Sequence, residues 1–397
     1  MKSQNAEGKI KNLLERNVNG IINKERLSKE LKSGRKLRIK LGIDPTGPEI
    51  HLGRAIALWK LKEFQDLGHQ IVLIIGDFTG LIGDASDKKT GRPMLSEQEI
   101  KKNMAGYPKQ VGKILDLKKT EFRRNSEWLV KLKIKDIIHL ASLFTVHQMI
   151  DRRNFKERFK NSQAIGLHEF LYPLLQGYDS VAVGADVEIG GTDQLFNLKA
   201  GRKIQEFYKQ KPQDIMTLEM VAGLDGQKMS TTSGNIINIA DEPNDMYGKI
   251  MSVRDELIPE YFLRCANLSQ TEINETIKRL KSGTPDYYKA KNNLAFELVK
   301  LYHSENAAVK AREYFVKTFQ KKEMPKDAPE IKIKKSEELA GILIRAGLVP
   351  SKGEFRRLIK NGAVEIGGEK IKDIHYGVSM SVAVKVGKKK FLKIILA

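Results

Sequence analysis

The feature that most constrains the fold is a strand–helix–strand pattern near the start of the chain. Apolar residues alternate with polar ones from Leu37 to Ile43, which predicts a strand, and the loop residues Asp44–Pro48 end it. Helical spacing follows from Ile56 to Leu67. Ile71–Ile75 is a continuous apolar run, typical of a parallel strand that is covered on both faces. The pattern predicts a βαβ unit and therefore an α/β protein with a parallel sheet.

A second pattern of the same kind occurs after residue 180. Val181–Val183 and Val187–Ile189 have the character of strands and lead into Gly190–Gln194, after which Leu195–Tyr208 has helical spacing. Open α/β sheets bind ligands at the carboxyl ends of their strands. The loop at His51, which follows the first strand, is therefore a predicted ligand-binding loop.

The chain of 397 residues is longer than one core usually serves, so several domains are expected. We expect residues 1–225 to form the sheet domain, with a basic and mainly helical insertion at about 105–160. The sequence of residues 226–320 is mostly helix-like. Residues 321–335 are charged, contain two prolines and are predicted to be a linker. Residues 336–397 are predicted to form the last domain.

This last stretch, Ser336–Ala397, differs in character from the rest. Its pattern predicts two short helices and then a hairpin, Ala363–Ile371, so a small α+β domain is expected. It contains twelve Lys/Arg against six Asp/Glu, and Arg356, Arg357 and Lys360 lie on the helix before the hairpin. A compact basic module is typical of a nucleic-acid-binding domain. A solvated helix face is the alternative interpretation of the same charges.

The formal net charge of +21 has two interpretations. A polyanionic partner would be held by phosphate neutralisation, whereas a generally lysine-rich proteome would give the same total. No apolar run reaches the roughly 20 residues of a membrane span, and Met1–Lys11 lacks the apolar stretch of a secretory signal. The lone cysteine, Cys265, excludes a cysteine-cluster metal site, and the histidines have no metal-ligand spacing. We therefore expect a cytoplasmic protein with no membrane partner and no protein-bound metal.

Two short loop segments far apart in the chain carry groups that bind phosphate. His51–Arg54 offers an imidazole and a guanidinium, and Lys228–Thr232 offers an ammonium and hydroxyls. The first lies at a predicted helix start, where free backbone N–H groups and the helix dipole favour anions. Position alone also allows His51 to be a simple helix cap.

These two segments belong to an ordered set of motifs. In chain order the set is His51-Leu52-Gly53-Arg54, Asp77–Asp84, Tyr172–Asp179, Gly190–Gln194 and Lys228-Met229-Ser230. From about Leu37 to its end, the chain resembles bacterial tyrosyl-tRNA synthetases, which are class I enzymes, and the first and last motifs resemble their HIGH and KMSKS signatures. The resemblance implies a Rossmann-like parallel-sheet catalytic domain, an α-helical anticodon-binding domain and a small α+β RNA-binding domain like that of a ribosomal protein.

The resemblance also implies a reaction and its partners. The carboxylate of tyrosine attacks the α-phosphate of ATP to give tyrosyl-adenylate and pyrophosphate, and the tyrosyl group then passes to the 3′ end of tRNA(Tyr). ATP carries Mg²⁺ in this reaction. Catalysis of this kind depends on positioning and on neutralising phosphate charge. Members of the family form symmetric dimers, with residues 131–147 near the interface.

Individual residues receive roles from the same resemblance. The implied catalytic residues are Thr46, His51, Lys88, Arg92 and Lys228. The implied ATP-binding residues are Asp44, His51, Gly53, Arg54, Asp193, Lys228, Met229 and Ser230. The implied tyrosine-binding residues are Leu41, Asp84, Tyr172, Gln176, Asp179 and Gln194, with Asp179 on the phenol hydroxyl. The RNA-binding candidates are Arg356, Arg357 and Lys360.

The chain departs from the family pattern at a few positions. Arg54 replaces the second histidine of HIGH, Thr231 replaces the second lysine of KMSKS, and Lys40 stands where one branch has a tyrosine. Ala85 and Asp87 replace a proline and a glycine. Arg54 and Thr231 motivate one alternative, a catalytically weakened paralogue that only binds RNA. The other alternative is a tryptophan-activating relative on the same fold.

Overall fold

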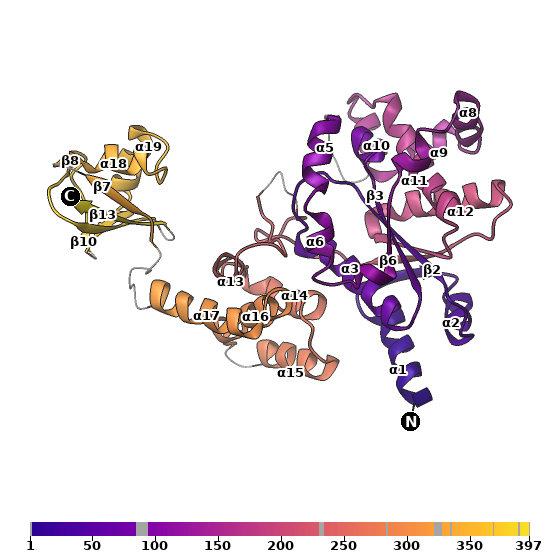
Figure 1. Cartoon of the computed structure of the whole chain (residues 1–397), viewed down its shortest axis with the longest axis horizontal. Helices are drawn as coiled ribbons and strands as arrows, with labels where there is room; N and C mark the ends of the chain where they lie inside the picture. Colours follow the sequence, from indigo (N-terminus) through magenta and orange to yellow (C-terminus); the bar gives the residue numbers. More distant parts are fainter. Residues whose placement is uncertain are drawn as a thin grey trace. The chain divides into compact units, whose positions relative to one another are not determined.

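The computed structural model describes residues 2–84, 94–229, 234–282, 285–320, 328–333, 336–367, 369–387 and 390–396. The chain divides into two compact units, Met1–Glu305 and Asn306–Ala397, which are described separately (Figure 1). The helical segment that precedes residue 305 therefore belongs to the same unit as the large sheet.

The first unit is built around a large sheet with the strand order β1-β6-β5-β2-β3-β4 in the part of the chain described. The strands are β1 (Val18–Ile22), β2 (Arg38–Ile43), β3 (Gln70–Ile75), β4 (Thr120–Arg124), β5 (Val187–Gly191) and β6 (Asp214–Leu218). Neighbouring strands from β6 to β4 pair in parallel, and β1 pairs antiparallel with β6. The predicted α/β class with a mainly parallel sheet is confirmed.

Helices connect these strands and continue after the sheet. They are α1 (Lys2–Glu15), α2 (Lys24–Lys32), α3 (Leu52–Asp66), α4 (Thr79–Ile82), α5 (Glu97–Met104), α6 (Tyr107–Val111), α7 (Ser126–Leu129), α8 (Ile134–Ser142), α9 (Val146–Ile150), α10 (Arg153–Lys160), α11 (Leu167–Val183), α12 (Leu195–Phe207), α13 (Pro243–Met251), α14 (Ile258–Cys265), α15 (Gln270–Lys281) and α16 (Tyr287–Tyr302). Figure 1 shows α11 and α12 side by side. Gly177 permits this close packing, because a Cβ there would lie 3.1 Å from the backbone nitrogen of Gly201.

One prediction within this unit is wrong. Val181–Val183 is the last turn of α11 and not a strand, and the helix ends at Gly184, which has a φ of 57°. The segment 105–160, predicted to be mainly helical, contains α6 to α10 and also the strand β4, which pairs in parallel with β3. The sequence of β4, Thr-Glu-Phe-Arg-Arg, lacks an apolar run because the strand lies at the sheet edge and is only partly buried.

The second unit contains α17 and a small α+β domain. Its elements are α17 (Glu305–Phe315), β7 (Glu330–Ile333), β8 (Glu337–Glu338), α18 (Leu339–Arg345), α19 (Lys352–Lys360), β9 (Val364–Ile366), β10 (Glu369–Lys370), β11 (Gly377–Val378), β12 (Val382–Val386) and β13 (Lys390–Leu396). The two predicted helices and the predicted hairpin, β9–β10, are confirmed. The end of the predicted linker is corrected, because β7 lies within 321–335 and pairs in parallel with β13.

Candidate active site

The strands β2, β3, β4 and β5 end at one edge of the large sheet, and polar residues follow each of them. Asp44 follows β2, Thr79 begins α4 after β3, Asn125 follows β4, and Gln194 lies after β5. Parallel pairing brings these four loops together. We name this cluster the carboxyl-edge site; its residues are Asp44, Thr46, His51, Arg54, Thr79, Asp84, Asn125, Trp128, Tyr172, Gln176, Asp179, Asp193, Gln194, Asn197 and Lys228.

Asp179 lies on α11 and is buried, with both carboxylate oxygens engaged. Trp128 donates its indole N–H to Oδ1 over 2.8 Å, and Asn125 donates its amide to Oδ2 over 3.3 Å. Burial raises the pKa of Asp179 to about 7, while the nearby Lys40 ammonium and the two donors lower it. Each carboxylate oxygen has a further lone pair, so Asp179 can accept one more hydrogen bond from a ligand hydroxyl.

A second buried carboxylate, that of Asp44, is linked to Asp179 through Thr79 and Asn125. Tyr172 donates its hydroxyl to one oxygen over 2.8 Å, and Thr79 donates to the other over 2.8 Å. Burial raises the pKa of Asp44 to about 6 against the effect of these two donors. Gly76 is required here, because a Cβ would collide with the Asp44 carboxylate and the Thr79 hydroxyl. Asn125 also donates to Thr79 over 2.9 Å, so the two carboxylates share one network.

Three of the predicted tyrosine-binding residues are joined by a chain of side-chain amides. Gln194 donates to Asp84 over 2.5 Å, and Asn197 donates to Gln194 over 3.0 Å and to Gln176 over 3.1 Å. Arg152 donates to Asn197 over 3.3 Å and lies 3.9 Å from the Asp84 carboxylate. The structure thus brings together Asp84, Gln176 and Gln194, although Asp84 and Gln194 are 110 residues apart in the chain.

His51 immediately precedes α3, as the sequence predicts. Its side chain makes no capping hydrogen bond, so the cap interpretation is not supported. The buried Nδ1 has no hydrogen-bond partner among the described residues. Burial, Arg54 and Lys228 lower the pKa of His51 to about 3, so the imidazole is uncharged at neutral pH. Gly53 leaves room for the ring, because a Cβ there would lie 3.1 Å from Nδ1.

Arg54 contacts the protein itself through both terminal nitrogens. One donates to the hydroxyl oxygen of Thr46 over 2.8 Å, and the other donates to the hydroxyl of Tyr107 over 3.0 Å. The Tyr107 hydroxyl in turn donates to the carbonyl oxygen of Gly47 over 2.9 Å. Arg54 therefore ties the loop after β2 to the first turn of α3.

The second signature segment reaches the same edge of the sheet. Lys228 forms an ion pair with Asp193 over 2.7 Å, and a cleft of about 1120 Å³ opens beside the pair. The cleft is also lined by Arg152, Lys199 and Lys203, so its walls carry several cations. It is large enough to give a nucleotide access to Asp193 and Lys228.

The remaining predicted residues have different outcomes. Lys88, Arg92 and Ser230 lie outside the described residues, as do Ala85, Asp87 and Thr231. Leu41 is buried in β2, and Met229 is buried near Gly53. In the second unit, Arg356, Arg357 and Lys360 are exposed on α19, where Arg357 pairs with Glu354.

Sequence reasoning missed four residues of the carboxyl-edge site, which are Thr79, Asn125, Trp128 and Asn197. It also missed Arg152, which donates to Asn197. Asn125 and Trp128 follow β4, so recognising that strand would have placed them at the carboxyl edge. Arg152 and Asn197 had no signal in the sequence, because their partners are side chains from other helices.

Two negative findings apply to the described residues. No described group of three or more His, Cys, Asp or Glu side chains is arranged to hold a metal ion. Among the helices that the structure describes, none is both long and apolar enough to cross a membrane.

Comparison with known proteins covers nearly the whole chain. Residues 32–320 match the family of class I tRNA synthetases (W and Y), and residues 320–394 match the tyrosine–tRNA ligase C-terminal domain of SYY-like type. The chain is 47% identical to the tyrosine–tRNA ligase of Thermotoga maritima, covering 96% of each protein. It is 45% identical to the tyrosine–tRNA ligase of Aquifex aeolicus, covering 94% of this chain and 95% of that one.

Solved structures support the fold. A tyrosyl-tRNA synthetase from Archaeoglobus fulgidus, crystallised with L-tyrosine, aligns with a TM-score of 0.62 at 22% identity and covers 77% of this chain and 99% of that chain. A truncated mitochondrial tyrosyl-tRNA synthetase from Aspergillus nidulans aligns with a TM-score of 0.64 at 19% identity, covering 78% and 94%. With the near-full-length sequence matches, these findings place the protein: the chain belongs to the tyrosine–tRNA ligases of the class I (W and Y) tRNA synthetase family.

Proposed function

We propose that the carboxyl-edge site binds tyrosine and ATP and forms tyrosyl-adenylate. Family membership gives the overall activity, which is the ATP-dependent joining of tyrosine to tRNA(Tyr). The observation that carries the site assignment is the buried Asp179, held by Asn125 and Trp128 in the same network as Asp44. A buried polar network with room for one more partner is suited to reading a ligand hydroxyl.

On the tyrosine side, Asp179 accepts the phenol hydroxyl in this proposal. Asp84, Gln176 and Tyr172 receive the α-amino group, Gln194 completes the amide chain, and Leu41 is part of the pocket wall. An ammonium group is a three-fold donor, and these side chains supply carboxylate, amide and hydroxyl oxygens to accept from it. The existing hydrogen bonds hold the acceptors in place before tyrosine binds, which lowers the cost of binding.

On the ATP side, the groups that meet phosphate are donors and cations. Thr46, His51 and Lys228 lie on loops at the carboxyl edge, with Gly53, Met229 and Ser230 as neighbours. Because the Thr46 oxygen accepts from Arg54, its own proton is left to donate to a phosphate oxygen. In this proposal Arg54 orients Thr46, and His51 donates as an uncharged imidazole. Lys88 and Arg92 are proposed as further cations, and Mg²⁺ arrives on ATP.

The ion pair between Lys228 and Asp193 suggests how the signature loop works. Asp193 is proposed to bind the ribose hydroxyls and Lys228 the pyrophosphate. ATP binding then separates the pair, because the ribose replaces the ammonium at Asp193 and phosphate replaces the carboxylate at Lys228. Charge that grows on the leaving pyrophosphate would be stabilised mainly in the transition state.

The decisive experiment is ATP–pyrophosphate exchange with each of the twenty amino acids. We expect exchange that depends on tyrosine. Exchange driven by tryptophan would favour the tryptophan-activating alternative, and absence of exchange with retained tRNA binding would favour the weakened paralogue.

We propose that the α+β domain of residues 336–397 binds tRNA through the exposed cations Arg356, Arg357 and Lys360. Its net charge of +6 supports this role, since phosphate contacts supply most of non-specific affinity for nucleic acid. Deletion of this domain is expected to raise the KM for tRNA and leave tyrosine-dependent exchange nearly unchanged. Loss of exchange in a folded deletion variant would refute the assignment.

We also propose that the protein is a homodimer that buries an apolar surface from the middle of the first unit. The exposed apolar residues of this stretch are Val130, Ile134, Ile138, Val146, Phe159 and Leu167. Ile134 and Leu167 are 81% and 82% exposed, and exposed apolar surface of this kind is typical of protein interfaces. We expect the parent to sediment as a dimer and the Ile134→Glu variant to sediment as a monomer. A monomeric parent would refute the proposal.

A further inference from the structure

A buried ion pair lies next to the turn of α11 that contains Asp179. Lys40 in β2 and Glu188 in β5 are joined by a 2.8 Å contact between Nζ and Oε1, and their side chains are 0% and 1% exposed. Replacing such a pair with apolar residues is often neutral or stabilising, because the charges lose their hydration. Stability alone therefore gives no reason for these residues, and their other contacts show what they hold.

The ammonium of Lys40 connects the sheet to one turn of α11. In addition to Glu188, it donates to the carbonyl oxygen of Gln176 over 2.9 Å and to the hydroxyl of Ser180 over 2.7 Å. All three of its N–H donors are thus used. Gln176 and Ser180 are one helical turn apart, and Asp179 lies between them in the chain.

Glu188 completes the cluster from the neighbouring strand. Its Oε1 accepts from the Gln176 amide over 3.2 Å, and its Oε2 accepts from Ser180 over 3.2 Å and from Gln213. Gly201 on α12 makes room for this arrangement. A Cβ at Gly201 would lie 3.0 Å from the Ser180 oxygen and 3.2 Å from Oε2 of Glu188.

We propose that Lys40 is a positioning residue for tyrosine recognition: paired with Glu188, it fixes the turn of α11 that carries Gln176 and Asp179 and places a positive charge beside Asp179. The inference rests on the proposed role of Asp179 as the acceptor of the phenol hydroxyl. A hydrogen bond to a charged acceptor is about twice as strong as one between neutral groups. Lys40 thus strengthens the bond that distinguishes tyrosine from phenylalanine.

The groups that face Asp179 come from several elements. Lys40 on β2 favours the ionised carboxylate, as do the donors Asn125 and Trp128, while Glu188 on β5 opposes it. The effect of Lys40 on the pKa of Asp179 is larger than that of Glu188. Removing both charges therefore favours the protonated acid, which is a weaker acceptor.

The test is the double variant Lys40→Met/Glu188→Met, in which no charge is left unpaired. Thermal unfolding reports whether it folds, and ATP–pyrophosphate exchange gives kcat/KM for tyrosine and for phenylalanine. We expect a folded protein whose tyrosine-to-phenylalanine ratio is lower by about tenfold or more at pH 7. We also expect its KM for tyrosine to fall between pH 7 and 8.5 more than in the parent, as Asp179 ionises.

Lys40→Gln provides a second variant that keeps a donor and removes the charge, in case the double variant does not fold. The matched control is Arg38→Met/Glu121→Leu, which removes another ion pair of β2 at the opposite edge of the sheet. Its ratio is expected to remain that of the parent. An unchanged ratio in either folded Lys40 variant overturns the inference.

Asp179→Asn separates this inference from the assignment on which it rests. If Asp179→Asn leaves the ratio unchanged, the role of Asp179 is wrong, whatever Lys40 does. If Asp179→Asn lowers the ratio and the folded Lys40 variants do not, only the role of Lys40 is wrong.

Discussion

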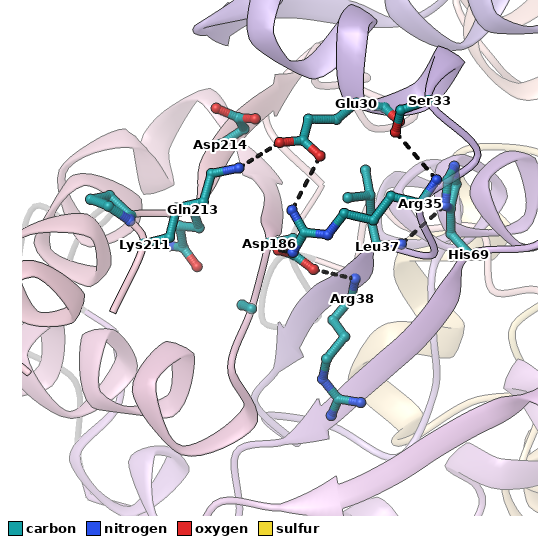
Figure 2. A network of polar contacts seen from close by, with 12 residues as sticks. Glu30, Ser33, Arg35, Leu37, Arg38, His69, Asp186, Lys211, Gln213 and Asp214 are labelled. Atoms are coloured by element: carbon teal, nitrogen blue, oxygen red, sulfur yellow. Dashed lines mark hydrogen bonds and ion pairs between the residues drawn. The ribbon is translucent and has the colours of Figure 1, made fainter. Parts of the chain in front are cut away.

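The two edges of the large sheet use charged residues in opposite ways. At the amino edge, where the parallel strands begin, cations and carboxylates satisfy one another (Figure 2). Glu30 accepts from Lys211 over 2.5 Å and from Arg35 over 3.1 Å, and Asp186 accepts from Arg35 over 2.6 Å and from the backbone N–H of Arg38 over 2.9 Å. These partners, against some desolvation, hold the pKa of Glu30 below its usual value.

At the carboxyl edge, Asp44, Asp179 and His51 are buried, and the two carboxylates accept hydrogen bonds from neutral donors. Burial raises the pKa of Asp44 to about 6 and that of Asp179 to about 7, and it lowers the pKa of His51 to about 3. The charged forms of these three groups are disfavoured, whereas the charged form of Glu30 at the amino edge is favoured. The comparison teaches that the groups of the amino-edge network are hydrogen-bonded to one another, whereas the buried groups at the carboxyl edge can still bind a ligand.

The largest expected effect is on the choice of amino acid. The parent should prefer tyrosine over phenylalanine by about 10⁴–10⁵ in kcat/KM, because phenylalanine leaves the buried Asp179 without its partner. Asp179→Asn should remove most of this preference. The matched change at the amino edge, Asp186→Asn, should leave it unchanged. Exchange assays with both amino acids measure the ratios, and equal loss in the two variants would show that the edges do not differ in function.

The next effect is on stability and its dependence on pH. The pKa of Asp179 is about 7 when folded and about 3.9 when unfolded, so the folded protein binds the extra proton between these values. Its contribution to the free energy of unfolding therefore falls as the pH rises from about 4 to about 7, by up to roughly 4 kcal/mol. Glu30 has the opposite sign: its lowered pKa gives stability above its unfolded pKa that is lost as the pH falls.

Urea unfolding of the parent, Asp179→Asn and Glu30→Gln between pH 4 and 8 checks these signs. The free energy of unfolding of the parent, minus that of Asp179→Asn, should fall as the pH rises and become constant above about pH 7. The free energy of unfolding of the parent, minus that of Glu30→Gln, should increase as the pH rises. If both differences changed with pH in the same direction, the contrast between the edges would be refuted.

A third effect separates two lysines that both pair with a carboxylate. Lys228→Ala should lower kcat for adenylate formation by about 10²–10³ with little change in the KM for tyrosine, because its contact with pyrophosphate strengthens in the transition state. Lys211→Ala breaks the pair with Glu30 at the amino edge and should not change kcat. Single-turnover formation of tyrosyl-adenylate measures both, and a parental rate in Lys228→Ala would exclude this loop from catalysis.

The sequence predicted the parts of the molecule whose pattern is local. The βαβ unit follows from the alternation in β2 and the apolar run of β3, and the same pattern located the loop at His51 at the carboxyl edge. The strand β4 was missed because an edge strand needs no apolar run. With it, Asn125 and Trp128 were missed, although they hold Asp179.

Contacts between distant side chains could not be predicted from the sequence. Lys40 was noted only as a departure from a family pattern, since nothing in the order of residues shows that Glu188 lies 2.8 Å away. In the same way, Arg54 was expected to contact ATP, and nothing in the order of residues indicates its hydrogen bonds to Thr46 and Tyr107. Such pairings depend on the packing of α3, α6 and α11 around the sheet, which no single segment encodes.

The smallest expected effect concerns Arg54. It orients the ligand-binding residue Thr46, whereas Arg35 and Arg38 at the amino edge bind carboxylates of the protein itself. Arg54→His should lower kcat for adenylate formation by about tenfold, because the shorter imidazole no longer bonds to Thr46 and its hydroxyl loses its fixed direction. Thr46→Val removes the hydroxyl itself. If Arg54 acts through Thr46, the double variant should be no slower than Thr46→Val alone, whereas a direct contact of Arg54 with ATP would make the two effects multiply. Tyr107→Phe keeps the bond between Arg54 and Thr46 and should have a smaller effect, so a loss as large as that of Arg54→His would assign the role to the loop and not to the threonine.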